Sequence, residues 1–278
     1  MKHAILVMGY GNDAAVLQAT INHLDDPQID FYIHWDQRYP LSQLKSSYSK
    51  IIFIKERQAV YWGTYSQIKA EYCLIKNVAN SDLNYDYLHL ISSHDIPLMQ
   101  KEYFKNYFTA PLYLGFVPSS EVDLTRISYY YPLIFKNFRS FSGRAYLKGV
   151  RFINRLFGIN RLNKLPNDIK IEKGTNWFSV NAKLIPTILN FPYLSLFQHS
   201  YCADELYLQT ILSQFKPQDN LLTDNNEMAA RYIDWQRGKP YTFTSKDILE
   251  LRDVINTKYA FARKVNNPQI IEELFKND

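Results

Sequence analysis

The chain has 278 residues, of which 46% are hydrophobic, and this is enough for one large α/β domain with a full core. It carries 32 Lys and Arg against 27 Asp and Glu, and no known nucleic-acid-binding motif accompanies them, so we expect no nucleic-acid partner. Two cysteines are too few for a disulfide framework, and no apolar run approaches the roughly 18 residues of a membrane span. We therefore expect a cytoplasmic protein without a signal peptide or membrane anchor.

Strands and helices alternate in the first half of the chain. This alternation predicts an α/β fold with a mostly parallel sheet covered by helices on both faces. The expected strands lie at residues 4–8, 29–34, 51–55, 87–92 and 112–117, the last of them near the functional edge of the sheet. The expected helices lie at residues 14–24, 65–78 and 102–108.

Residues 120–172 interrupt this alternation with a basic, aromatic-rich and irregular segment. From Arg126 to Lys173 it has eleven Lys or Arg against two acidic residues. We interpret it as an insertion or lid within a single domain that spans residues 1–278. The alternation then returns, with a strand expected at 177–180 and helices at 182–189, 204–212 and 245–256, the last of them capped by Ser245.

Within this insertion, apolar residues recur at helical spacing and predict an amphipathic helix. The pattern fits a helix bound to an anionic membrane surface and an ordinary surface helix with a solvated basic face equally well. The apolar stripe consists of Tyr146, Leu147, Val150, Ile153, Leu156 and Phe157, and the basic face includes Lys148, Arg151 and Arg155.

An Asp-Glu pair, Asp204 and Glu205, opens an apolar run with helical periodicity. Carboxylates at a helix start lie near the positive end of the helix dipole, so at least one of them can stay ionised. An ionised carboxylate at the edge of a pocket can take a proton from a hydroxyl. The alternative is structural, because Asp204 could cap the helix while Glu205 is solvated, as is common for such pairs.

Residues 9–14 follow the first expected strand and fit the dinucleotide fingerprint G-x-G-x-x-A. Asp36 ends the second expected strand, where a ribose-binding acid would lie, so an NAD-dependent oxidoreductase is one interpretation. Nothing further along the chain supplies a clear hydride-transfer site. The pattern places a nucleotide at the carboxyl ends of these strands.

Motifs occur along the chain from about residue 4 to residue 265. They are Asp30-Phe-Tyr-Ile-His-Trp-Asp36, Arg57 with Val60-Tyr-Trp-Gly-Thr-Tyr-Ser66, Leu90-Ile-Ser-Ser-His-Asp-Ile-Pro-Leu98, Gly174-Thr-Asn-Trp-Phe-Ser-Val-Asn181, Tyr201-Cys-Ala-Asp-Glu-Leu-Tyr-Leu-Gln-Thr-Ile-Leu212, Ala230-Arg-Tyr-Ile-Asp-Trp-Gln236 and Phe261-Ala-Arg-Lys264. In this order and spacing they resemble the core-2/I-branching β-1,6-N-acetylglucosaminyltransferase and xylosyltransferase family, which is glycosyltransferase family 14.

The resemblance implies a GT-A-like, Rossmann-type fold and an inverting glycosyltransferase that moves a sugar, GlcNAc by family default, from UDP to a hydroxyl with β-linkage. Glu205 would be the general base. No Asp-x-Asp metal motif occurs, the histidines lack zinc-ligand spacing, and the resembled enzymes use basic side chains instead, so we expect neither metal nor other cofactor. The implied donor-site residues are Gly9, Asp36, Arg57, Asp95, Lys239, Arg263 and Lys264, and the implied acceptor-site residues are Trp177, Asp204, Trp235 and Arg237.

Some of these residues have ordinary structural interpretations. Asp95 could serve the turn before Pro97, Arg237 and Lys239 could be solvated cations, and Trp235 could belong to the core. The implied partners are a UDP-sugar and a bacterial surface glycan or lipid-linked glycan, reached at the inner face of the cell membrane. The alternatives are a different donor sugar, an NAD-dependent oxidoreductase and a non-catalytic glycan-binding protein.

Overall fold

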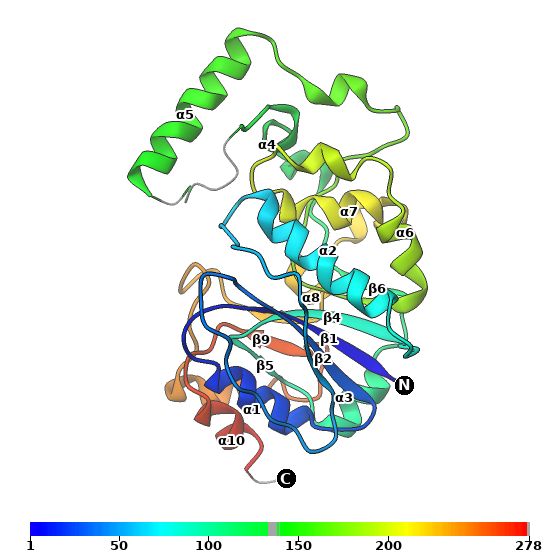
Figure 1. Cartoon of the computed structure of the whole chain (residues 1–278), viewed down its shortest axis with the longest axis vertical. Helices are drawn as coiled ribbons and strands as arrows, with labels where there is room; N and C mark the ends of the chain where they lie inside the picture. The colour runs from blue at the N-terminus through cyan, green and yellow to red at the C-terminus, as the bar shows by residue number, and fades with distance from the viewer. Residues whose placement is uncertain (133–137, 139, 277–278) are drawn as a thin grey trace.

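The fold is built on a central six-stranded sheet, and the computed structural model describes residues 1–132, 138 and 140–276 (Figure 1). The strands are β1 (His3–Gly9), β2 (Ile29–Trp35), β3 (Ile51–Phe53), β4 (Tyr87–Ser92), β6 (Leu112–Leu114) and β7 (Phe178–Asn181). Their order is β3-β2-β1-β4-β7-β6; the first four are parallel, and β7 is antiparallel to both of its neighbours. The predicted α/β architecture, consistent with a GT-A-like fold, is confirmed.

Helices cover both faces of this sheet because its central strands turn apolar side chains to both sides. In β1, Leu6 packs in one core and Ile5 in the other. The core around Leu6 also takes side chains from α2 (Tyr65–Ala79), α6 (Ile185–Leu189) and α7 (Tyr207–Ile211). The core around Ile5 takes them from α1 (Ala15–Leu24) and α3 (Lys101–Tyr107).

A second sheet of three short strands was not predicted from the sequence. It has the order β5-β9-β8, with β5 (Asp95–Pro97), β8 (Arg231–Ile233) and β9 (Phe261–Arg263), and it packs with α9 (Ile248–Arg252) and α10 (Gln269–Leu274). The buried Arg231 joins the two sheets, since its Nη2 donates to the carbonyls of Leu90 in β4 (3.0 Å) and Phe178 in β7 (2.6 Å). This sheet brings the 261–264 segment beside residue 95.

Three expected helices are shorter than the sequence predicted. Each begins with a 3₁₀ turn: Ala203–Glu205 before α7, Ala182–Leu184 before α6 and Ser245–Asp247 before α9. The prediction that Ser245 is the cap is wrong. Thr244 has the extended backbone that a cap requires, and it forms a capping box with Asp247, so Ser245 already lies in the first turn.

The basic insertion at residues 120–172 is more helical than expected. It contains α4 (Thr125–Ser128), α5 (Phe141–Leu156) and a 3₁₀ turn at Arg161–Lys164. A further helix, α8 (Asn225–Met228), lies outside the insertion, just before β8. In Figure 1, α5 stands at the edge of the molecule, away from the central sheet. The insertion is anchored by backbone hydrogen bonds to the region before α7, from Tyr131 to His199 (3.0 Å) and from Tyr201 to Arg126 (2.8 Å).

The expected strand at 112–117 ends at Leu114 because the chain then meets residues 173–175. The N–H of Val117 donates to the carbonyl of Lys173 (2.9 Å), and the N–H of Gly174 donates to that of Glu205 (3.0 Å). A Cβ on Gly174 would lie 1.8 Å from the carbonyl oxygen of Gly115. The two backbones therefore approach this closely only because residue 174 is glycine.

We predict that Gly174→Ala lowers the free energy of unfolding by about 1–3 kcal/mol, because the added methyl group overpacks this contact. Urea unfolding measures the change. Gly149→Ala in α5 is the matched control, since a Cβ there would have no neighbour within 4 Å. That variant should be unchanged or more stable by up to roughly 1 kcal/mol. Equal stability of the two variants would contradict the argument.

Candidate active site

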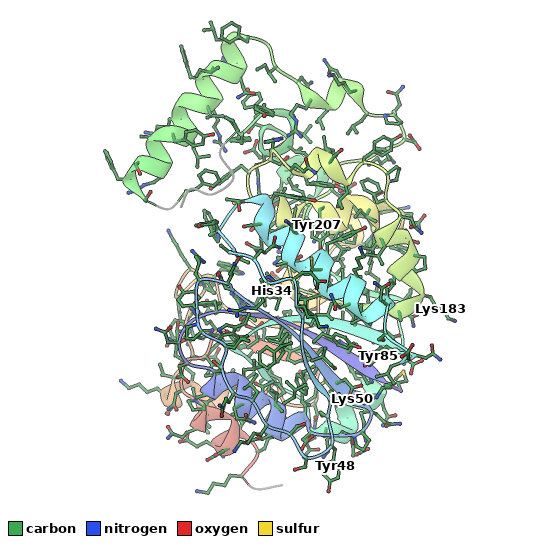
Figure 2. The ribbon with its side chains drawn as sticks, viewed as in Figure 1. His34, Tyr48, Lys50, Tyr85, Lys183 and Tyr207 are labelled. Atoms are coloured by element: carbon green, nitrogen blue, oxygen red, sulfur yellow. The ribbon has the colours of Figure 1, made fainter. Side chains whose placement is uncertain are left out.

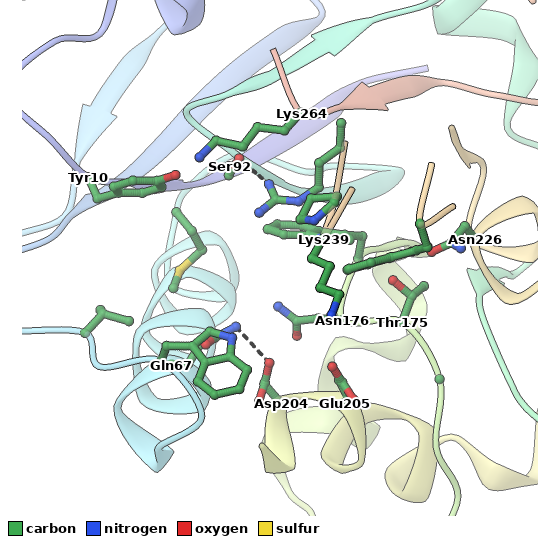
Figure 3. A pocket seen from close by; sticks show the side chains of 18 of the residues that line it. Tyr10, Gln67, Ser92, Thr175, Asn176, Asp204, Glu205, Asn226, Lys239 and Lys264 are labelled. Carbon is green, nitrogen blue, oxygen red and sulfur yellow. Dashed lines mark hydrogen bonds between the residues drawn. The ribbon is translucent and has the colours of Figure 1, made fainter. Parts of the chain in front are cut away.

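A cavity of about 850 Å³, lined by charged, polar and aromatic side chains, opens beyond the carboxyl ends of β1, β2 and β4. This is the edge at which α/β sheets bind nucleotides. The second sheet closes one side of it, and the segments before α2 and α7 close the other (Figure 3). The sequence-predicted residues that line the cavity are Gly9, Asp36, Trp177, Asp204, Glu205, Trp235, Lys239, Arg263 and Lys264.

Arg263 lines the cavity, and its positive charge is partly neutralised by Asp95, which lies behind it. Its Nη1 donates to Asp95 Oδ1 (2.7 Å) and to Ser92 Oγ, and its guanidinium lies 4.1 Å from the centre of the Trp177 ring. Asp95 is 1% exposed and does not itself line the cavity. The structure therefore places Asp95 behind Arg263, where it fixes the orientation of the guanidinium.

Lys264 lies beside an aromatic pair at the end of β1. Its Nζ is 5.5 Å from the centre of the Tyr10 ring, which stacks on His94 at 4.8 Å. Burial and the positive charge of Lys264 lower the pKa of His94 to about 4, so His94 is neutral at pH 7. Lys264 thus presents a second cation to the cavity beside Arg263, and Tyr10 is a lining residue that sequence reasoning missed.

Asp36 meets the cavity as part of an ion pair. Its Oδ2 accepts from Arg38 (2.6 Å) and from the N–H of Val60 (3.2 Å), and Arg38 lies over the Tyr61 ring at 4.7 Å. Burial raises the pKa of Asp36, but the hydrogen bonds from Arg38 outweigh it and hold the pKa below its usual value. Arg38 was not predicted, because a charged residue in a loop gives no signal of its own.

Arg57 and Arg237 do not line the cavity. The guanidinium of Arg57 donates to the backbone carbonyls of Trp35 (2.8 Å) and Tyr39 (2.6 Å), so it shapes the loop after β2. Arg237 pairs with three carboxylates, those of Asp234, Asp247 and Glu250, so it shapes the loop that carries Trp235 and Lys239. Sequence reasoning placed both arginines among the binding residues, whereas the structure places them one layer behind.

Glu205 is bound on one side by an arginine from the insertion. Both Nη1 and Nη2 of Arg126 donate to Glu205 Oε2 at 2.9 Å. Glu205 Oε1 forms no hydrogen bond with any of the residues that the structure describes, and the side chain is 40% exposed. Arg126 also donates to the carbonyls of Tyr201 and Cys202. No sequence pattern indicated this pairing, because residues 126 and 205 are far apart in the chain.

Asp204 is the buried partner of Glu205. Its Oδ2 accepts from Gln67 of α2 (2.9 Å), while its Oδ1 is buried without a partner among the described residues. Burial and the neighbouring charge of Glu205 raise the pKa of Asp204 to about 7. The 3₁₀ turn at Ala203–Glu205 is what directs the two adjacent carboxyl groups into the same cavity.

A second buried acid supports this side of the cavity. Glu71 of α2 is fully buried and accepts from Asn176 Nδ2 (3.0 Å) and from the hydroxyl of Tyr207 (2.7 Å). Burial and the nearby Asp204 raise the pKa of Glu71 well above its usual value. Asn176 lines the cavity, and its Oδ1 has no hydrogen-bond partner in the described part of the chain. Glu71 was missed because it lies inside an ordinary helical pattern.

Lys264 and the pair Asp204 and Glu205 lie on opposite sides of the cavity (Figure 3). Figure 3 shows Lys264 and Tyr10 on one side, Asp204 and Glu205 on the other, and Lys239 between them. Among the described residues, no group of three or more His, Cys, Asp and Glu side chains is arranged to hold a metal ion. In the same part of the chain, none of the helices has the length and apolar character needed to cross a membrane.

A mostly parallel sheet with a cavity at the carboxyl ends of its strands is the arrangement in which α/β proteins bind nucleotides. Residues 4–256 match the family model of the Core-2/I-Branching enzyme, and the chain belongs to that family. It is therefore a glycosyltransferase, and its family implies a nucleotide-sugar donor and a glycan acceptor. No curated protein matches the chain. The segment with Arg263 and Lys264 lies beyond the matched residues, so only the geometry and the sequence motif connect it to the site.

We predict that the stability of the protein falls as the pH rises from about 4 to 7, relative to an Asp204→Asn variant. The ordinary pKa of Asp is 3.8, so between 3.8 and about 7 the folded protein keeps a proton that the unfolded chain has lost. The contribution of protonated Asp204 to the free energy of unfolding is therefore complete below pH 3.8 and lost above about pH 7. The difference should be on the order of a few kcal/mol.

Thermal unfolding of both proteins at pH 4, 5, 6, 7 and 8, a series of roughly unit steps across the window, measures this effect. Titration of the buried histidines, which changes stability in the opposite direction, is common to both proteins and cancels in the comparison. Parallel curves would mean that Asp204 is ionised in the folded protein throughout, and would contradict the prediction.

Proposed function

We propose that the protein is an inverting, metal-independent glycosyltransferase that moves a sugar, GlcNAc by family default, from UDP to a hydroxyl of a bacterial surface glycan. The separation of Glu205 from Lys264 across the cavity is the observation that supports this most directly. A displacement reaction needs a base beside the incoming hydroxyl and positive charge beside the leaving group. Glu205 and Lys264 lie on opposite sides of the cavity, as this geometry requires (Figure 3).

Glu205 is the proposed base. Arg126 occupies Oε2, which fixes the carboxylate, and Oε1 is left to accept the proton of the acceptor hydroxyl. The hydroxyl oxygen forms a bond to the anomeric carbon as the bond from that carbon to UDP breaks. Attack from the face opposite UDP converts an α-linked donor into a β-linked product. The proton stays on Glu205, and the electron pair leaves with the diphosphate.

Lys264 and Lys239 are the proposed cations for the departing diphosphate. Both line the cavity, and fixed ammonium groups can stabilise the charge that develops as UDP leaves. Arg263 shares its charge with Asp95, so we assign it chiefly to shaping this corner. Metal independence is proposed because these cations can perform the task that an Asp-x-Asp-bound ion performs in other transferases.

Further polar and aromatic groups of the cavity are proposed to bind the sugars. Asp204 Oδ1 and Asn176 Oδ1 are buried without described partners, and sugar hydroxyls would satisfy both of them. Trp235 is 54% exposed at the cavity and offers an indole face to a pyranose ring of the acceptor. Trp177 faces Arg263 instead, so we assign it to the donor side rather than to the acceptor.

A thermal-shift screen distinguishes this proposal from its alternatives. The ligands are UDP, UDP-GlcNAc, other UDP-sugars, NAD⁺ and NADP⁺, each with and without EDTA. UDP and one UDP-sugar should raise the melting temperature by a few degrees at about 100 times their dissociation constants. A shift with NAD(P)⁺ alone would support an oxidoreductase. If the protein binds a UDP-sugar but releases no UDP with any glycan acceptor, the non-catalytic glycan-binding alternative is supported instead.

We predict that Glu205→Gln slows sugar transfer by on the order of 10²- to 10⁴-fold, because an amide cannot take the hydroxyl proton. UDP binding, measured by calorimetry, should stay within about twofold of the wild type, a change of less than 0.5 kcal/mol. Glu121→Gln is the matched control, since Glu121 is exposed and does not line the cavity. Near wild-type turnover by Glu205→Gln would show that another group is the base.

We predict that Lys264→Ala weakens UDP binding by roughly tenfold or more, the loss of one charge-assisted contact, and also slows transfer. Activity of the wild type should survive EDTA. The exposed Lys246 provides the control variant Lys246→Ala, which should behave as the wild type. A strict requirement for Mn²⁺, together with unchanged UDP binding by Lys264→Ala, is the result that excludes the metal-independent mechanism.

A further inference from the structure

Helix α5 presents large apolar side chains to solvent. Phe141, Phe152 and Leu156 are 83%, 67% and 66% exposed, and Phe157 just after the helix is 72% exposed. Single exposed apolar residues are normal on a protein surface, but several large ones that recur along one helix are a candidate interaction site. The helix stands at the edge of the molecule, away from the central sheet (Figure 1).

Within the helix, the exposed face shares only Leu156 with the apolar stripe that the sequence predicted. Val150 of that stripe is 7% exposed and faces the protein, beside Asn154, whose side chain bonds both backbone groups of Tyr130. At 3.6 residues per turn, Phe141, Phe152 and Leu156 lie on the opposite side of the helix. We call these three residues the outer face of α5.

Basic side chains flank the outer face on one side. Arg144, Lys148 and Arg155 are exposed and form no ion pair with any described residue. Arg151, which the sequence grouped with them, is instead 3.6 Å from Asp123 and lies over the Tyr201 ring at 5.9 Å. The chain has no Asp or Glu between Asp123 and Asp168, so no acidic group of this segment offsets the flank.

We propose that the outer face of α5 docks on an anionic lipid bilayer. Its apolar side chains would enter the boundary between headgroups and acyl chains, while Arg144, Lys148 and Arg155 contact the negative headgroups. A second copy of the chain fits this surface less well. A symmetric dimer places the same patch on both sides of the interface, so the unpaired cations of the two copies would face each other.

The position of α5 connects this docking to the cavity. Arg151 of α5 lies over Tyr201, and the Tyr201 ring meets Trp62 at 6.1 Å. Trp62 lines the cavity. These contacts place α5 two side chains away from the cavity lining, so docking would bring the enzyme to the surface on which a lipid-carried acceptor would lie. Membrane docking itself does not depend on the proposed reaction, so the two can fail separately.

Sedimentation with lipid vesicles tests the proposal. The probes are vesicles of phosphatidylcholine alone and of phosphatidylcholine mixed equally with phosphatidylglycerol, at low and at physiological salt. The protein should bind the anionic vesicles, more weakly at higher salt, and bind the neutral vesicles much less. The triple variant Arg144→Gln, Lys148→Gln and Arg155→Gln should bind roughly 100-fold more weakly, about fivefold for each cation.

A second triple variant, Phe141→Ser, Phe152→Ser and Leu156→Ser, should also lose binding by at least roughly tenfold, because the apolar contact is removed. Its matched control is Tyr48→Ser, Leu221→Ser and Leu249→Ser, at side chains that are 67%, 64% and 74% exposed. The control for the basic variant is Lys50→Gln, Lys183→Gln and Lys246→Gln. Figure 2 shows Tyr48, Lys50 and Lys183 far from α5.

Both controls should bind vesicles as the wild type does, and the melting temperature of every variant confirms that it is folded. The proposal is overturned if the wild type binds neither kind of vesicle or binds both equally. It is also overturned if the controls lose as much binding as the α5 variants. A dimer in sedimentation velocity that only the outer-face variant abolishes would assign this face to a second copy instead.

Discussion

The guanidinium of Arg126 holds together the part of the protein that carries its carboxylates. It donates to the carbonyls of Tyr201 and Cys202 and to Oε2 of Glu205, and its side chain is only 10% exposed. A buried charge that loses its partner is strongly destabilising, so these contacts cannot open independently. Because Arg126 lies in α4, the insertion and the segment that carries Glu205 form one unit. The position of the proposed base therefore depends on a residue outside every recognised motif.

The two sides of the cavity are built on different electrostatic principles. On one side, burial is the main influence on the pKa values of Asp204 and Glu71 and raises both of them. Among the described residues, neither acid has a directly bound cation that would lower its pKa again. On the other side Arg263 is paired with Asp95, while Lys264 remains available to the cavity. Burying polar groups without hydrogen-bond partners lowers the stability of the folded protein. Such groups are typical of a site that binds a polar ligand.

The sequence predicted the elements of the central sheet well because long, buried, regularly patterned segments carry a strong local signal. It missed the second sheet, since strands such as β5 and β9 have only three residues and no periodicity to read. In the site, motifs pointed to Glu205, Lys264 and Trp235, which line the cavity. Arg57, Asp95 and Arg237 were also placed among the binding residues, although the structure puts them behind the cavity wall. A motif does not tell whether a residue lines the cavity or lies behind its wall.

The sequence by itself determined the α/β class, the family and the edge of the sheet at which the cavity lies, because periodicity and motif order are properties of neighbouring residues. Only the tertiary structure decided which groups meet there. The contacts of Arg126 with Glu205, of Glu71 with Asn176 and of Gln67 with Asp204 join residues far apart in the chain. The same holds for α5, whose apolar face could be assigned to solvent only once its packing was known. Burial is a property of the folded molecule, so neither the raised pKa of Asp204 nor the exposed face of α5 can be derived from the sequence alone.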